Sequence, residues 1–114
     1  MNYSLSIRLA AEELREIEYN EFDDTYSAIG TPFENPIRML NVQNLTDATM
    51  VFSLDGATDH FILPSFGFLF IDITSNKTRD SGWFIAQESS IYVRDLLNSA
   101  TTGFVYVSAF YGKN

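Results

Sequence analysis

The residues of this chain that could act as nucleophile or base are few. Cysteine is absent and His60 is the only histidine, so nucleophilic catalysis would need a serine or threonine that His60 activates. Asp59 directly precedes His60 and could orient the imidazole only if the backbone bent unusually. No serine lies in a Gly-x-Ser-x-Gly turn. We therefore predict that His60 is a strand-edge histidine beside a turn.

Paired carboxylates are the second possible source of chemistry. Two carboxyl groups at a suitable separation could hydrolyse a glycoside, and the sequence offers three pairs: Glu12-Glu13, Asp23-Asp24, and Asp55 with Asp59. Acidic pairs are common in loops, so these pairs do not favour a glycosidase. We predict no catalytic residue and no enzymatic activity.

The segment Asp55-Gly56-Ala57-Thr58-Asp59 could offer oxygen ligands to calcium. It lacks the alternating acidic ligands and the distal glutamate of an EF-hand loop. We predict instead a turn in which Asp55 accepts hydrogen bonds from nearby backbone amides. The sequence also has no glycine-rich phosphate loop, so we predict neither a bound metal nor a cofactor.

The net charge of −8 excludes one class of partner. Binding to nucleic acid requires a basic patch that displaces counterions, and the seven basic residues are scattered. No apolar run approaches the ~20 residues of a membrane-spanning helix, and the start lacks the pattern of a signal peptide. We therefore expect synthesis in the cytoplasm, no membrane partner, and no glycosylation at the Asn-x-Thr patterns of Asn44 and Asn76.

Aromatic residues are abundant: ten Phe, six Tyr and one Trp. Most can be absorbed by a core, since each buries about 150–250 Å², but several could lie in contacts between subunits. Trp83 or Tyr92 on an exposed face could instead stack on a sugar. Trp83 follows a glycine loop and is more simply a core anchor.

Alternating apolar and polar residues predict an all-β, antiparallel sandwich or jelly roll of about eight short strands with an N-terminal extended arm. Asp55-Gly56 predicts a hairpin turn, and the proline-containing segment 21–36 predicts a loop between sheets. The nearly continuous apolar run 66–73 predicts a strand that is covered on both faces. The predicted strands are 15–20, 37–43, 49–54, 61–63, 66–73, 83–85, 90–96 and 104–111.

The chain length of 114 residues predicts one domain. We divide it into an N-terminal arm, 1–13, and a sandwich domain, 14–114. The arm carries Leu5, Ile7 and Leu9 on one side, and such an apolar strip must be covered by its own domain or by the sheet edge of a neighbour. The segment Ser65-Phe66-Gly67 predicts a bulky aromatic at an exposed turn; for the arm and for Phe66 alike, ordinary core packing is the alternative. Leu5, Ile7, Leu9 and Phe66 are the predicted assembly contacts.

A series of short motifs, between about Leu14 and Gly112, resembles a family of small virion proteins of tailed bacteriophages. The N-terminal extension, 2–13, departs from that family's pattern. The motifs are Gly30-Thr31-Pro32-Phe33, Pro36-Ile37-Arg38-Met39-Leu40, Asn44-x-Thr46-Asp47, Asp55-Gly56-x-x-Asp59-His60, Leu63-Pro64, Thr74-Ser75-Asn76, Tyr92-Val93-Arg94 and Gly103-x-Val105-Tyr106-Val107.

The resemblance implies a β-sandwich virion subunit, made in the host cytoplasm. By analogy with cement proteins of similar size, we expect a capsid decoration subunit that ties neighbouring copies of the major capsid protein together. Such a subunit would act as a homo-oligomer, most simply a dimer. Two alternatives remain: a neck or tail ring subunit between portal and tail, and a carbohydrate-binding module.

Overall fold

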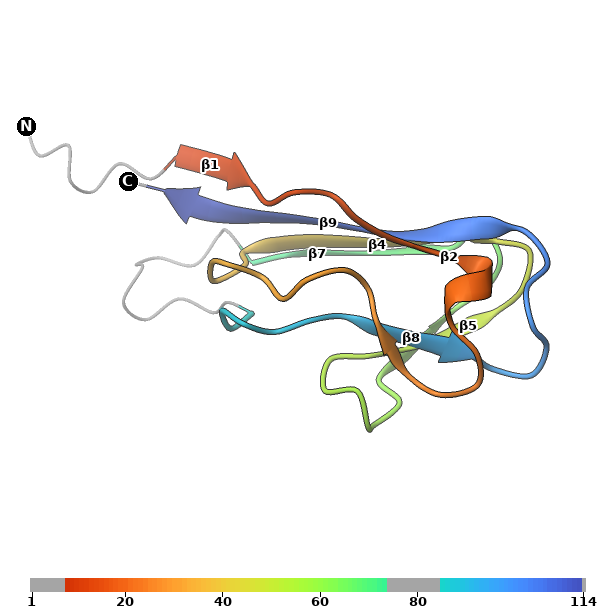
Figure 1. Ribbon diagram of the computed structural model, residues 1–114. Helices are drawn as coiled ribbons and strands as arrows, with labels where there is room; N and C mark the ends of the chain where they lie inside the picture. The colour runs from red at the N-terminus through yellow and green to blue at the C-terminus, as the bar shows by residue number, and fades with distance from the viewer. Residues whose placement is uncertain (1–7, 74–84, 114) are drawn as a thin grey trace, which may run out of the picture.

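The computed structural model describes residues 8–73 and 85–113 as an all-β fold of two antiparallel sheets packed as a sandwich (Figure 1). This confirms the predicted fold class, with nine strands where about eight were expected. Within the described residues, no helix has the length and apolar composition needed to cross a membrane. The predicted contacts Leu5 and Ile7, and also Trp83, lie outside the described residues.

The larger sheet has five strands in the order β1-β9-β4-β7, with β2 also paired to β9. The smaller sheet has four strands in the order β3-β8-β5-β6, and one 3₁₀ turn, Tyr19–Glu21, follows β2. The bounds are β1 (Arg8–Ala11), β2 (Arg15–Glu18), β3 (Ser27–Ala28), β4 (Met39–Thr46), β5 (Met50–Ser53), β6 (Phe61–Leu63), β7 (Phe68–Asp72), β8 (Tyr92–Asp95) and β9 (Gly103–Lys113).

The strands β4 to β7 form one long hairpin that is folded over. Its base, β4 with β7, belongs to the larger sheet, and its upper part, β5 with β6, belongs to the smaller sheet. The hairpin therefore has two corners, residues 47–49 and 64–67. Its tip contains the predicted Asp55-Gly56 turn, where Gly56 has a φ of 78° that glycine adopts readily.

Asn44 holds the two corners together. Its side chain is fully buried, and its Nδ2 donates to the carbonyl oxygens of Ala48, Leu63 and Pro64 at 2.9, 3.0 and 3.1 Å. Its Oδ1 accepts from the backbone and hydroxyl of Thr46. Because Asn44 and Thr46 are both buried, the first Asn-x-Thr pattern is a structural element of the corner.

The core lies between the sheets and follows the alternation in the sequence. In β4 and β9, every second residue points inward and the intervening ones point away from the sandwich. All four residues of β5 are buried, and the ring of Phe52 stacks on Phe61 with centroids 5.1 Å apart. The largest fully buried side chains are Phe33, Phe52, Ile29, Ile37, Leu40, Met50, Ile91, Val42, Val51, Val93, Val105 and Val107.

One strand differs from the sequence-based prediction in a way that matters for function. The run 66–73 was predicted to be covered on both faces, and this is wrong. The strand within it, β7, is an edge strand, and Phe68 and Phe70 are exposed. The reason is that the larger sheet packs against the smaller one on a single side, so side chains on its other side have no second layer above them within residues 8–73 and 85–113.

Candidate protein-interaction face

The residues best suited to catalysis, His60 and Asp59, form hydrogen bonds that hold local structure together. Nδ1 of His60 accepts a hydrogen bond of 2.9 Å from the backbone N–H of Leu54, so the imidazole closes the β5–β6 hairpin. The carboxylate of Asp59 accepts from Nη2 of Arg94 at 2.9 Å and from the hydroxyl of Tyr26. Asp59 is therefore not bonded to the imidazole beside it, and the two side chains do not form a catalytic pair.

Asp55 forms the predicted turn. Its Oδ1 accepts from the backbone N–H groups of Ala57 and Thr58, both at 2.8 Å, and from the hydroxyl of Ser53. Hydrogen bonds from Thr58, Ala57 and Ser53 hold the pKa of Asp55 well below its usual range. The described residues contain no group of three His, Asp or Glu placed to hold a metal ion.

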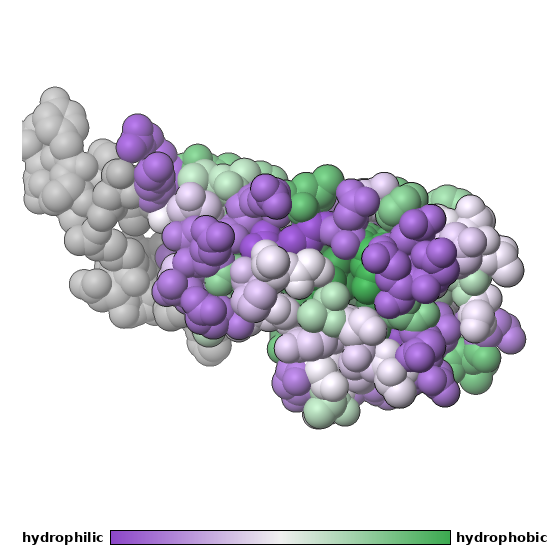
Figure 2. Space-filling model, viewed as in Figure 1, coloured by the Kyte–Doolittle hydropathy of each residue, from purple (hydrophilic) through white to green (hydrophobic). Residues whose placement is uncertain are grey.

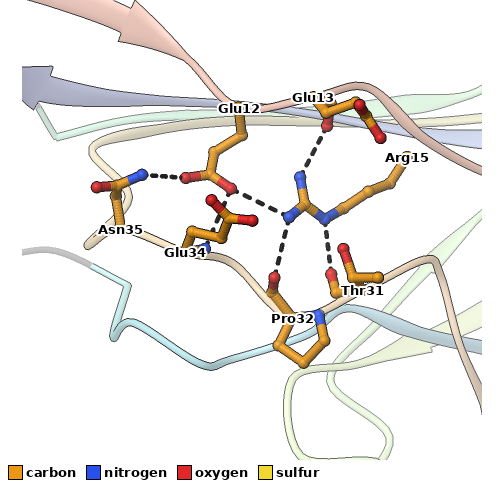
Figure 3. Close-up of polar contacts among 7 residues, drawn as sticks. All are labelled: Glu12, Glu13, Arg15, Thr31, Pro32, Glu34 and Asn35. Carbon is orange, nitrogen blue, oxygen red and sulfur yellow. Dashed lines mark hydrogen bonds and ion pairs between the residues drawn. The ribbon is translucent and has the colours of Figure 1, made fainter.

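Glu12 and Arg15 form a buried ion pair that acts as a structural clamp (Figure 3). Nη2 of Arg15 lies 3.0 Å from Oε1 of Glu12. The guanidinium also donates to the carbonyl oxygens of Glu13, Thr31 and Pro32 at 2.7, 2.7 and 3.0 Å. Four of its donor directions are thus satisfied by the protein, and the pair fixes the segment before β2 against the loop 31–35.

Replacing Glu12 by glutamine is expected to lower the free energy of unfolding at pH 7 by about 1–2 kcal/mol. Oε1 accepts from Arg15 and the Glu34 amide, and Oε2 accepts from Asn35. Either orientation of a glutamine amide therefore sets an NH₂ group against a donor. Chemical denaturation of Glu12→Gln measures this cost, and Glu13→Gln, an exposed neighbour with the same charge change, is the control with no effect.

The same variant has a defined pH dependence. Burial alone would raise the pKa of Glu12, but hydrogen bonds from Asn35, Glu34 and Arg15 outweigh burial and lower it below the usual value of 4.5. A lowered carboxyl pKa contributes stability above its unfolded value, and that contribution is lost as the pH falls through the folded value. The stability difference between wild type and Glu12→Gln should therefore shrink below about pH 4.5. A constant difference down to pH 2 would contradict this role.

The side of the larger sheet that points away from the sandwich is the outer face. It carries aromatic residues on β7 and β9, with the mixed apolar and polar residues of β4 between them. In the register, Phe68 lies beside Gln43, which lies beside Tyr106. The rings of Phe104 and Tyr106 stack with centroids 5.8 Å apart. The residues of the outer face are Phe68 and Phe70 of β7, Met39, Asn41, Gln43 and Leu45 of β4, and Phe104, Tyr106, Ser108 and Phe110 of β9.

Two of these aromatic residues are unusually exposed to solvent: Phe68 is 66% and Phe70 is 48% exposed. Between them and β9 lies Asn41, whose Oδ1 is buried without a hydrogen-bond partner in the protein. Figure 2 views the sandwich from the side, where mainly polar residues face the viewer and apolar groups gather along the upper margin over β1 and β9. The outer face is therefore the natural candidate for a protein contact.

Phe66 lies at the end of the outer face, on the corner that precedes β7. The N–H of Gly67 donates to the carbonyl of Pro64 at 2.9 Å, and the N–H of Phe66 donates to the carbonyl of Asn44 at 2.7 Å. This turn gives Phe66 a φ of 65° and leaves its side chain 73% exposed. An exposed aromatic in a left-handed conformation is costly, and such strain tends to occur at functional sites.

The structure separates the predicted contacts that it describes. Leu9 is exposed on β1, at one edge of the larger sheet, where it pairs with Gly112. Phe66 lies beyond β4 at the opposite edge, near Asn44. Phe68 and Phe70 were missed because the run was predicted to be covered on both faces. The spacing Phe66-x-Phe68-x-Phe70 could have found them, since residues two apart share a face of a strand.

The motifs that carried the resemblance lie partly in strands β4, β8 and β9 and partly in turns, which include Gly30, Asp55-Gly56 and Pro64. Thr74-Ser75-Asn76 lies outside the described residues. The motifs do not overlap with Phe68 or Phe70. No protein-family model matches the chain, and no curated protein matches it.

Proposed function

We propose that this chain is a non-catalytic structural subunit that binds other proteins through its outer face. The observation that carries this proposal is the exposure of Phe68 and Phe70 on the same face of the larger sheet as the stacked pair of Phe104 and Tyr106. The chain has a net charge of −8. Aromatic residues are enriched in the cores of protein interfaces, and contiguous exposed apolar patches mark interaction sites.

The acidic residues at the border of the outer face indicate which charges a partner would carry. Glu16 and Glu18 of β2 lie beside Tyr106 and Phe104 in the register, and their carboxylates border the aromatic group. A complementary surface would present apolar side chains in its centre and Lys or Arg at its rim, because complementary charges guide association and fix orientation. No basic residue of β4 or β7 interrupts this arrangement.

The specific form of the proposal is a capsid decoration subunit of a tailed bacteriophage, bound to the major capsid protein. This form rests on the sequence motifs, and a rigid sandwich with an aromatic face suits it. A capsid lattice is held by many modest contacts, and a subunit that reaches two neighbours gains affinity through effective concentration. Such a role needs a stiff scaffold and a contact surface, and it needs no reactive centre.

The test is the copy number in purified virions of the phage that encodes the chain. Quantitative mass spectrometry is expected to find this polypeptide in numbers comparable with the major capsid protein. About a dozen copies per particle would indicate instead a ring at the neck or tail, whose subunits are few because cyclic symmetry closes. Absence from the particles would contradict both forms of the proposal.

A matched pair of variants tests the contact surface. Phe66→Asn is expected to raise the free energy of unfolding by about 0.5–1 kcal/mol, because asparagine tolerates positive φ better than phenylalanine. Glu88→Asn should stabilise equally, since Glu88 is also exposed with a φ of 73°. Only Phe66→Asn should weaken binding to particles that lack the subunit, by about tenfold. Equal binding of both variants would remove Phe66 from the contact.

A further inference from the structure

The outer edge of β7 can accept another strand. In the part of the chain that the structure describes, β7 pairs only with β4 and is the last strand of the larger sheet. An edge strand presents backbone N–H and C=O groups that template the pairing of a further strand. Natural proteins protect such edges with charged residues or proline, yet β7 reads Phe-Leu-Phe-Ile-Asp.

The register identifies which groups point away from β4. The carbonyl of Gly67 accepts from the N–H of Asn44, and the N–H of Ile73 donates to the carbonyl of Arg38, both at 2.9 Å. Hydrogen bonding in an antiparallel pair involves every second residue. Positions 67, 69, 71 and 73 therefore bond to β4. Phe68 and Phe70 direct their N–H and C=O groups toward the outer edge.

Charge selects a second copy as the occupant of this edge. Two chains of net charge −8 repel each other unless they meet where charge is scarce. Segment 61–73 contains one charged residue, Asp72. Positions 66–71 carry no basic or acidic side chain, so this edge cannot form ion pairs with a charged strand of another protein. Two copies of the edge can pair without bringing like charges together at these positions.

We propose that a second copy of this chain pairs antiparallel with β7, across a two-fold axis at Leu69. Phe68 of each copy then faces Phe70 of the other, which gives two equivalent aromatic cross-strand pairs and joins the two larger sheets into one. Such pairs stabilise antiparallel strands, and the outward N–H and C=O groups of Phe68 and Phe70 supply the hydrogen bonds. Asp72 falls outside the paired residues, beside Phe66 of the other copy.

The exposed area predicts a reversible dimer. With about 200 Å² for a whole phenylalanine side chain, the exposed parts of Phe66, Phe68 and Phe70 amount to roughly 370 Å² in each copy. Twice this area lies below the ~1,200–2,000 Å² of stable interfaces and in the class of weak ones. The dimer should therefore dissociate on dilution at micromolar concentrations. This pairing goes beyond the proposed function, because it joins two copies of the chain and requires no second protein.

Sedimentation velocity of the purified full chain over a concentration series is the first test. We expect a monomer–dimer equilibrium, and at least about a tenfold weaker dimer for Phe68→Glu/Phe70→Glu, which sets like charges opposite each other. Ile62→Glu is the control, since Ile62 is 55% exposed but lies on β6 of the smaller sheet. A wild-type chain that stays monomeric up to about 1 mM, or Ile62→Glu as disruptive as the double variant, would overturn the pairing.

Single cysteines test the register, because the chain has no cysteine of its own. Across the proposed axis, the two Leu69 residues form a non-hydrogen-bonded pair with Cα atoms about 4.5 Å apart, which a disulfide can bridge. Leu69→Cys should therefore cross-link in a glutathione buffer about tenfold more than Phe70→Cys, whose two Cα atoms lie more than about 7 Å apart in this register. Equal cross-linking of both, or more of Phe70→Cys, would overturn the proposed register.

Two further readouts keep these tests decisive. Far-ultraviolet circular dichroism reports whether Leu69→Cys is folded, and the wild-type concentration series decides the pairing even if it is not. Binding to particles is measured separately on the wild-type chain. A chain that binds particles as a monomer refutes the pairing and leaves the proposed function intact. A chain that dimerises but binds no particle supports the pairing and contradicts the proposed function.

Discussion

Replacing Asn44 by aspartate is expected to lower the free energy of unfolding at pH 7 by about 3–5 kcal/mol. The Nδ2 group that donates to three backbone carbonyls becomes a carboxylate oxygen, which faces the oxygens of Ala48, Leu63 and Pro64 at about 3 Å. The site is fully buried, so water cannot replace the lost donor. A domain of this size has roughly 5–15 kcal/mol of stability in total, and the variant should be largely unfolded at modest urea concentrations.

Asn98→Asp is the matched control for this variant. It makes the same chemical change and the same change in net charge, but Asn98 is exposed in the loop between β8 and β9. Its free energy of unfolding should stay within about 0.5 kcal/mol of wild type. The deficit of Asn44→Asp should also shrink at acidic pH, because a protonated carboxyl can donate one hydrogen bond. A difference between the two variants below about 1 kcal/mol at pH 7 would mean that Asn44 does not hold the corners.

The second large effect is expected at Gly103, the first residue of β9. Its φ is 104°, and a Cβ added there would lie 2.1 Å from the carbonyl oxygen of Leu45. Because the obstructing atom belongs to the backbone of the paired strand β4, a side chain cannot move aside to relieve the clash. Gly103→Ala should therefore destabilise the chain by about 3–5 kcal/mol, through strained backbone and steric overlap together.

Thermal unfolding measures this effect, with Gly112→Ala as the control. Gly112 lies in the same strand, is exposed, and has no positive φ. It should change the free energy of unfolding by less than about 0.5 kcal/mol. If Gly103→Ala were as stable as Gly112→Ala, the start of β9 would not be fixed against β4 as the register requires.

These two residues show why local sequence signals could locate the strands but not every constraint on them. The alternation in β4 and β9 predicted which residues face the core, because a strand repeats every two residues. The hydrogen bonds of Asn44 reach corners 4 to 20 residues away. No spacing rule connects those positions before the hairpin folds, so the hydrogen bonds of Asn44 were not predicted.

The outer face was misjudged for a related reason. A continuous apolar run is compatible with burial on both faces, and the sequence around β7 has no signal for which side receives a second layer. That depends on where the smaller sheet packs. The exposed turn at Phe66 was predicted, and the spacing of two residues places Phe66, Phe68 and Phe70 on one side of the run. The strand order then shows that no other strand or layer of the described residues covers this side.

The clamp at Glu12 and Arg15 was also missed, although their spacing of three residues was present in the sequence. Glu12 was considered only as one of an acidic pair with Glu13. Arg15 is buried because its guanidinium donates to the carbonyl groups of Thr31 and Pro32 on the loop 31–35, as well as to that of Glu13 in its own segment. Long-range backbone acceptors of this kind leave no pattern in the local sequence.

The corner at Asn44 links stability to the proposed contact surface. The carbonyl of Asn44 accepts from the N–H of Phe66, and its N–H donates to the carbonyl of Gly67. The residue that locks the folded hairpin thus also fixes the turn that exposes Phe66 and leads into β7. A stiff corner presents the aromatic side chains in one arrangement, which reduces the entropy that a binding partner must overcome.

The most direct test of the account is hydroxyl-radical footprinting of the chain free in dilute solution and in the purified virions that we propose contain it. We expect oxidation of Phe68 and Phe70 to fall at least about fivefold in the particle, as expected for aromatic residues at the centre of an interface. Leu97, which is 86% exposed in the loop between β8 and β9, provides the internal reference. Phe68 and Phe70 that react as readily in the particle as in the free chain, relative to Leu97, would contradict the claim that the outer face binds other proteins.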